Sequence, residues 1–175
     1  MAHQKKYSDM KRPDLLSFKE MPKKPLALAL DNVRSLHNIG SLFRTADGFS
    51  IEKLFLCGIT GRPPHKEIRK TAIGAEESVE WSHHPDLFTL LKHLKENYYV
   101  VALEQTYSSI DLQDFIWDKK KPILLIVGNE VSGISEDVLS LSDCHIEIEQ
   151  FGTKHSLNVS VAASIAMFHI CNQMK

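Results

Sequence analysis

The stretch that decides the fold is ILLIVGNEVSGIS, residues 123–135, in which five apolar residues lead into a loop with a glycine near each end. An unbroken apolar run of this length is typical of a strand that is buried on both faces of a parallel sheet. A similar run, LALAL, occupies residues 26–30, and residues 53–57, 98–103 and 145–148 predict three more strands. The sequence therefore predicts a sheet of mainly parallel strands.

Helices are expected between these strands. Apolar residues recur at helical spacing from Ile39 to Phe49, where Asn38 is a candidate N-cap, and again over residues 86–95. A last helix is predicted from about Ser156, while residues 67–80 fit neither pattern clearly. Alternating strands and helices predict an α/β fold with helices on both faces of the sheet. In such folds, ligands bind beyond the carboxyl ends of the strands.

The loop in the opening stretch resembles a phosphate-binding loop, but it departs from that motif in two ways. Residues 128–135 match G-x-x-x-x-G-K-[ST] except that Ile134 stands where the motif has lysine. Glu130 also places a carboxylate in the middle of the loop, where it would repel a phosphate. The glycines, Gly128 and Gly133, then indicate close approach of a ligand that is not a polyphosphate. An ordinary strand-turn-helix connection remains the alternative for this loop taken alone.

The composition is that of an ordinary globular domain of 175 residues, with 43% hydrophobic and 25% charged residues. The apolar runs are too short to cross a membrane. Three cysteines without a CxxC pair are typical of a reduced, cytoplasmic protein. The nine histidines show no H-x-x-x-H pattern, so we expect no metal site.

The net charge of −1 hides two basic clusters. Residues 1–25 form a basic N-terminal arm that precedes a single domain, residues 26–175. The second cluster follows two prolines and contains Arg62, Lys66, Arg69 and Lys70. Local basic patches can bind phosphates in a chain that is neutral as a whole, although a solvated surface is the simpler interpretation of each cluster.

Two further stretches accompany the glycine loop. NVRSLHNIGSLFRTADGF, residues 32–49, carries Asn38 and Arg44 less than two helical turns apart, which we expect to bring both toward one pocket. FGTKHSLNVSVAAS, residues 151–164, places Ser156 and Asn158 where the final helix begins. Short polar side chains and free backbone N–H groups at such a position can bind a ligand.

Together these stretches resemble the SpoU/TrmH family of SPOUT RNA methyltransferases. The three family motifs occur in order as N-x-G-S-x-x-R-T-A at residues 38–46, G-x-E-x-x-G at residues 128–133 and S-L-N-V-S-V-A at residues 156–162. The stretch KTAIGAEESVEW, residues 70–81, is similar to the segment that the family carries between the first two motifs. The resemblance covers roughly residues 26–172.

The resemblance implies an enzyme that methylates a ribose 2′-hydroxyl of tRNA or rRNA with S-adenosylmethionine. It also implies a C-terminal deep trefoil knot and a homodimer with each site near the subunit interface. The residues that it implies for catalysis are Arg44, Asn38, Ser156 and Asn158. Those that it implies for the cofactor are Leu103, Gly128, Glu130, Gly133, Ile148 and Leu157. We expect RNA to contact the basic arm and a set of exposed cations, namely Arg34, Arg62, Lys66, Arg69 and Lys70.

One residue departs from the family pattern. Glu149 stands where the family usually has proline, beside a site that is expected to bind a sulfonium cation and an RNA phosphate. Two other functions remain possible from the sequence: a catalytically inactive RNA-binding or ribosome-associated protein of the same fold, and a nucleotide-binding α/β enzyme of another class.

Overall fold

A computed structural model describes residues 3–6 and 9–174. These residues form one seven-stranded sheet in the order β3-β2-β1-β6-β4-β7-β5, in which every neighbouring pair of strands is parallel. The strands are β1 Lys24–Asp31, β2 Ile51–Cys57, β3 Trp81–His84, β4 Tyr99–Leu103, β5 Ile110–Asp111, β6 Ile123–Val127 and β7 Cys144–Glu147. The predicted α/β class with a mainly parallel sheet is confirmed.

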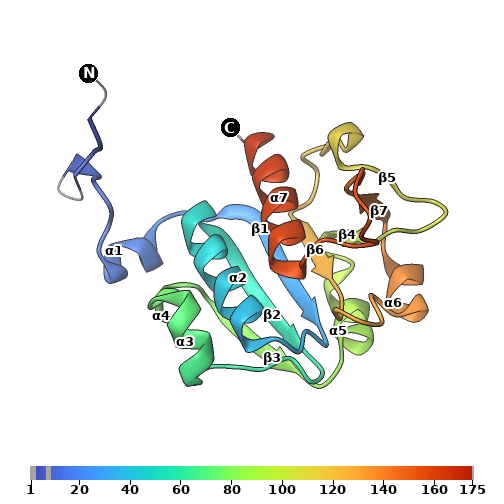
Figure 1. The fold of residues 1–175 in the computed structure, drawn as a ribbon, viewed down its shortest axis with the longest axis horizontal. Coiled ribbons are helices and arrows are strands. Elements are labelled where there is room, and N and C mark those ends of the chain that lie inside the picture. Colours follow the sequence, from blue (N-terminus) through green and yellow to red (C-terminus); the bar gives the residue numbers. More distant parts are fainter. Residues whose placement is uncertain (1–2, 7–8, 175) are drawn as a thin grey trace.

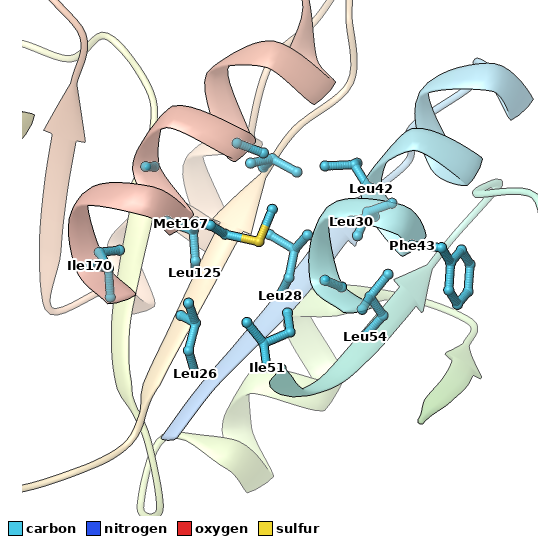
Figure 2. Close-up of a cluster of buried hydrophobic side chains, with 14 of the residues drawn as sticks. Leu26, Leu28, Leu30, Leu42, Phe43, Ile51, Leu54, Leu125, Met167 and Ile170 are labelled. Atoms are coloured by element: carbon cyan, nitrogen blue, oxygen red, sulfur yellow. The ribbon is translucent and has the colours of Figure 1, made fainter. Parts of the chain in front are cut away.

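Helices cover both faces of the sheet (Figure 1). Their bounds are α1 Leu15–Glu20, α2 Leu36–Phe49, α3 Lys66–Ala72, α4 Ala75–Ser78, α5 Leu87–Leu94, the 3-10 helix η2 Leu112–Asp114, α6 Glu136–Leu141 and α7 Val159–Asn172. Because side chains alternate along a strand, the leucines of β1 pack against α2 and α7 on one face of the sheet, and its alanines pack against α5 and α6 on the other. Figure 2 shows the first of these layers, with Met167 of α7 directed toward Leu28 of β1.

Helices α2 and α7 lie side by side and run in the same direction (Figure 1). Asn38 contacts Asn158 at their first residues, and the hydroxyls of Thr45 and Ser164 lie 3.1 Å apart further along. The rings of Phe49 and Phe168 meet at the far end, with centroids 6.3 Å apart. This parallel packing brings the N-terminal ends of the two helices together, and those ends carry two of the sequence motifs.

The structure corrects several predicted boundaries. Asn38 is not the N-cap of α2; Ser35 is, and its hydroxyl accepts a hydrogen bond from the Asn38 N–H at 3.3 Å. Helix α7 begins at Val159, with Asn158 as its cap, because the Asn158 carboxamide oxygen accepts the free N–H groups of the first turn. Residues 67–80, which fitted no clear pattern, form α3 and α4.

The N-terminal arm extends away from the sheet and carries α1, which buries none of its residues (Figure 1). Strand β1 begins at Lys24, within the last residues of the predicted arm, and the Lys24 ammonium group donates a hydrogen bond to the Cys171 carbonyl at 3.0 Å. Residues 1–2 and 7–8 of the predicted arm lie outside the described residues. No helix in the described part of the chain is both long and apolar enough to cross a membrane.

Candidate functional site

A pocket of about 400 Å³ lies beyond the carboxyl ends of β4, β6 and β7, three neighbouring strands. The loops after these strands form most of its wall, and the start of α7 closes it. All six residues predicted for cofactor binding line this pocket, together with two of the four predicted for catalysis: Leu103, Gly128, Glu130, Gly133, Ile148 and Leu157, with Ser156 and Asn158. Two stretches from the C-terminal half of the sequence therefore meet at one site.

The glycine loop after β6 folds tightly back on itself. The N–H groups of Asn129 and Gly133 each donate to the other's carbonyl, at 3.2 Å and 2.9 Å. A side chain on Gly128 would collide with the backbone of Gly133 and Ile134, and Gly133 has φ of +66°, which favours glycine. Glu104, at the end of β4, accepts the Ile134 N–H at 2.9 Å and fixes the far end of the loop. The glycines therefore allow a compact loop at the pocket wall.

Glu130 connects this loop to the beginning of α2. Its carboxylate accepts hydrogen bonds from the backbone N–H groups of Arg34 at 3.0 Å and Ser35 at 3.1 Å, and from the Asn38 amide at 3.1 Å. Partial burial alone would raise the pKa of Glu130, but these hydrogen bonds outweigh it and lower the pKa below the usual value. The free N–H groups at the N-terminal end of a helix attract a carboxylate, so the negative charge of Glu130 stabilises the beginning of α2.

Asn38 and Asn158 complete a polar chain across the three motifs. The Asn158 amide donates to the Asn38 carboxamide oxygen at 3.1 Å, while the Asn38 amide donates to Glu130. The Asn158 oxygen is occupied in turn by the N–H groups of Ser160 and Val161 at the first turn of α7. Each asparagine thus has a fixed orientation, and the chain Glu130–Asn38–Asn158 forms one edge of the site.

Arg44 is not among the residues that line the pocket. It lies exposed on α2, and its guanidinium makes no hydrogen bond or ion pair with the described part of the chain. Six residues of an α-helix correspond to a rotation that leaves Arg44 about 120° from Asn38 around the helix axis. Within one chain, the structure therefore brings together Asn38, Ser156 and Asn158 but leaves Arg44 apart.

The residues predicted to bind RNA are all exposed. Arg34 lies in the loop after β1, next to Glu130. Arg62, Lys66, Arg69 and Lys70 lie on the loop after β2 and on α3. Arg69 is partly neutralised, because its guanidinium lies 4.0 Å from Glu76 and 3.7 Å from Glu77.

Several polar residues that line the pocket were not predicted from the sequence. Glu104 and Gln105 follow β4, and Glu147 and Gln150 stand at and just after the end of β7. The Gln105 amide donates to the His155 carbonyl at 3.0 Å and so holds the loop that carries Ser156. Their position at the carboxyl ends of parallel strands was the available signal. Glu149, the departure from the family pattern, is exposed and does not line the pocket.

The site suits a ligand with positive charge or with N–H donors. Three carboxylates line it, those of Glu104, Glu130 and Glu147, and lysine and arginine are absent from its wall among the described residues. Such a wall would repel a polyphosphate. No three His, Cys, Asp or Glu side chains gather as potential metal ligands within residues 3–6 and 9–174.

Both the sequence and the fold are similar to those of known proteins. Residues 25–168 match the model of the SpoU rRNA Methylase family. The tRNA (guanosine(18)-2′-O)-methyltransferase of Thermus thermophilus is 34% identical over 152 residues, which cover 85% of this chain and 75% of the relative. The crystal structure of the Aquifex aeolicus TrmH/SpoU tRNA modifying enzyme superposes with a TM-score of 0.77 at 28% identity, covering 91% of this chain and 80% of that one.

A third similarity concerns the fold alone. The SpoU methyltransferase AviRb of Streptomyces viridochromogenes, solved in complex with the cofactor AdoMet, superposes with a TM-score of 0.77 at 24% identity. The match covers 90% of this chain and 64% of AviRb.

Proposed function

The chain belongs to the SpoU rRNA Methylase family, and we propose that it transfers a methyl group from S-adenosylmethionine to a ribose 2′-hydroxyl of tRNA or rRNA. The observation that carries the proposal is the convergence of the three motifs, through Glu130, Asn38 and Asn158, at one edge of a pocket. The same polar residues argue against a catalytically inactive RNA-binding protein, because such a protein would have no need to keep them in this arrangement.

The pocket fits S-adenosylmethionine by its size and its charge. Leu103, Gly128, Ile148 and Leu157 line it, and their backbone groups can bind the adenosine part, for which no lysine is needed. The carboxylates of Glu104 and Glu147 complement the amino group and the sulfonium centre. When bound, the cofactor supplies a methyl group on a sulfonium, which is an activated leaving group.

The protein's main task is to place the ribose hydroxyl in line with the methyl group and to help it lose its proton. In the transfer, the 2′-oxygen would form a bond to the methyl carbon as the bond between that carbon and sulfur breaks, S-adenosylhomocysteine would leave, and the hydroxyl proton would pass to solvent water. Asn158 and Ser156 stand at the pocket edge where they can orient the ribose. Arginine side chains are in general too strongly protonated to act as a base, so we assign Arg44 to binding the adjacent phosphate and the hydroxyl oxygen.

A homodimer would supply Arg44 to a site that its own chain does not complete. Because Arg44 lies away from the pocket of its own subunit, we propose that Arg44 of the partner subunit completes each site. Helix α7 supports this proposal, since Val161, Ile165 and Phe168 leave an apolar face that is 48%, 40% and 58% exposed. Burial of such a face against a second copy would remove it from water.

Two other features follow from family membership as proposals. The C-terminal part of the chain, which contains β6, β7 and α7, would form the deep trefoil knot of the family. The protein would act in the cytoplasm, which agrees with its three free cysteines, Cys57, Cys144 and Cys171.

The test is transfer of radiolabelled methyl from S-adenosylmethionine to bulk tRNA and rRNA, followed by mapping of the 2′-O-methylated ribose. We expect Arg44→Ala to lower the rate of transfer by about a hundredfold, as for loss of one charged group that stabilises a transition state. Lys95→Ala, an exposed cation at the end of α5, is the matched control and should transfer at the wild-type rate. Undiminished transfer by Arg44→Ala would remove Arg44 from the site, and no transfer to any RNA by a protein that binds S-adenosylmethionine would refute the function.

A further inference from the structure

A second hollow, separate from the pocket described above, lies on the other side of α2. It has a volume of about 490 Å³ and is formed by the loop after β2, by α3 and α4, and by the first residue of β3. None of its lining residues belongs to the first pocket. The resemblance to the methyltransferase family assigns no role to this hollow beyond the surface cations at its rim.

A buried carboxylate forms part of the hollow's wall. The side chain of Glu76 is only 9% exposed, and its Oε2 atom is buried without any hydrogen-bond partner in the structure. The nearest cation, the guanidinium of Arg69, lies 4.0 Å from the other carboxylate oxygen, which is too far for a hydrogen bond. Because an unpaired buried carboxylate oxygen is costly, Glu76 requires a donor that the described chain does not supply.

The neighbouring walls present flat, weakly polar surfaces. Trp81 forms one wall, and its indole is held edge-to-face by Phe43, with ring centroids 6.4 Å apart and planes at 89°. Pro63, Pro64 and His65 form the wall contributed by the loop. Aromatic side chains of this kind stack on the bases of single-stranded nucleic acid, which is a sequence-tolerant interaction.

Cations surround the opening of the hollow. Lys66 and Arg69 line it, and both are exposed. These groups would repel a cationic ligand such as a lysine or arginine side chain, while the buried carboxylate of Glu76 would repel a simple anion. The combination favours a flat, neutral ring that carries N–H donors and is attached to a phosphate.

We propose that this hollow binds an unpaired guanine of the RNA substrate. Guanine is the base whose Watson–Crick edge carries two adjacent N–H donors, at N1 and N2, which match the acceptor-only carboxylate of Glu76 once a rotation of that side chain brings the buried Oε2 to the hollow. The ring stacks on Trp81, and the phosphate of the same nucleotide contacts Lys66 and Arg69. The inference deepens the proposed function, because it rests on an RNA substrate and names a second point at which that RNA is recognised.

The chain offers a specific reporter for this binding. Its two tryptophans are Trp81 and Trp117, and Trp117 lies elsewhere, with its indole N–H donating to the Lys121 carbonyl at 2.8 Å. In the protein carrying Trp117→Phe, tryptophan fluorescence therefore comes from Trp81 alone. We expect guanosine 5′-monophosphate to quench this fluorescence saturably, and we expect the adenosine, cytidine and uridine monophosphates to bind more weakly.

Two adjacent glutamates provide the decisive comparison. Adding Glu76→Gln should weaken binding of guanosine 5′-monophosphate at least about tenfold, because the buried acceptor loses its charge. Glu77→Gln removes the same charge from a side chain that is 57% exposed and also faces Arg69, and it should change the affinity by less than about twofold. Calorimetry with S-adenosylmethionine should give the wild-type affinity for both variants, which also shows that each variant is folded.

Several results would overturn the proposal: no quenching by any nucleotide, equal losses in the two variants, or quenching by methylguanidinium in place of nucleotides. The measurement needs no methyl transfer, so its failure is distinguishable from failure of the proposed function. If both hold, Glu76→Gln should raise the KM for RNA and leave kcat near the wild-type value.

Discussion

Replacement of Gly133 by alanine should weaken binding of S-adenosylmethionine through a specific contact. Gly133 has φ of +66°, which an alanine adopts only at a cost. An added Cβ would also lie 2.5 Å from Oε2 of Glu104. That oxygen accepts the Ile134 N–H at 2.9 Å, so Glu104 would have to move and the end of the loop would lose its anchor.

The two costs can be estimated separately. An alanine in the left-handed region costs about 1–2 kcal/mol. Loss of a hydrogen bond to a charged acceptor costs about 1.5–3 kcal/mol, and partial exposure of Glu104 places this site near the lower value. If about 2.5–3.5 kcal/mol in total opposes the ligand-bound form of the loop, the dissociation constant should rise by about 60- to 320-fold.

Isothermal titration calorimetry with S-adenosylmethionine tests this estimate. Gly152→Ala is the matched control, because Gly152 lies on the next loop and a Cβ there would meet nothing within 4 Å. In a Glu104→Ala background, the effect of Gly133→Ala should shrink to the backbone cost alone, or about 5- to 30-fold. Wild-type affinity of the single variant, or an equal effect in both backgrounds, would refute the role of the contact with Glu104.

Two further predictions concern the polar chain that joins the motifs. Asn158→Ala removes the N-cap of α7 and should lower the free energy of unfolding by about 1 kcal/mol in urea titrations. Asn158→Asp keeps the cap but loses the donor to Asn38, so its stability should stay close to wild type while the rate of methyl transfer falls. Equal losses of stability in the two variants would contradict this division of roles. Glu130→Gln should be less stable than wild type at neutral pH. Because the pKa of Glu130 is lowered in the folded state, the ionised carboxylate stabilises the fold at pH values above the ordinary glutamate pKa of 4.5. This contribution disappears as the pH falls through the lowered pKa. Urea titrations across that range should show the two proteins converging in acid, and a difference that is independent of pH would count against the assignment.

The sequence predicted the family and the class of fold because both are determined by local patterns. The resemblance to the SpoU/TrmH family is confirmed by the family model and by the Thermus relative. The buried strands β1 and β6 were found because their apolar runs are unbroken. Strands β3 and β5 were missed because they have four and two residues at or near the sheet edges, where little burial is required and hydrophobic periodicity has no room to appear.

The error at the beginning of α2 has a physical cause that bears on the site. Ser35 and Asn38 are both good capping residues, and the sequence alone does not decide between them. In the structure Ser35 accepts the Asn38 N–H, which leaves the Asn38 side chain free to join Glu130 to Asn158. The residue that looked like a cap is thus a connection between motifs that lie 92 and 120 positions away along the chain.

The spacing of Asn38 and Arg44 in the sequence predicts that they lie close together along the axis of α2. It does not place them on the same face, because six residues of a helix also correspond to a rotation of about 120° around the axis. Because Asn38 faces α7, the same rotation turns Arg44 toward solvent, as the structure shows. A single subunit therefore offers a pocket with an oriented asparagine pair but no arginine, and the dimer that we propose supplies the missing group. Mixed dimers would test this directly, since one subunit carrying Arg44→Ala and the other Gly133→Ala should retain one intact site in two if the arginine acts across the interface.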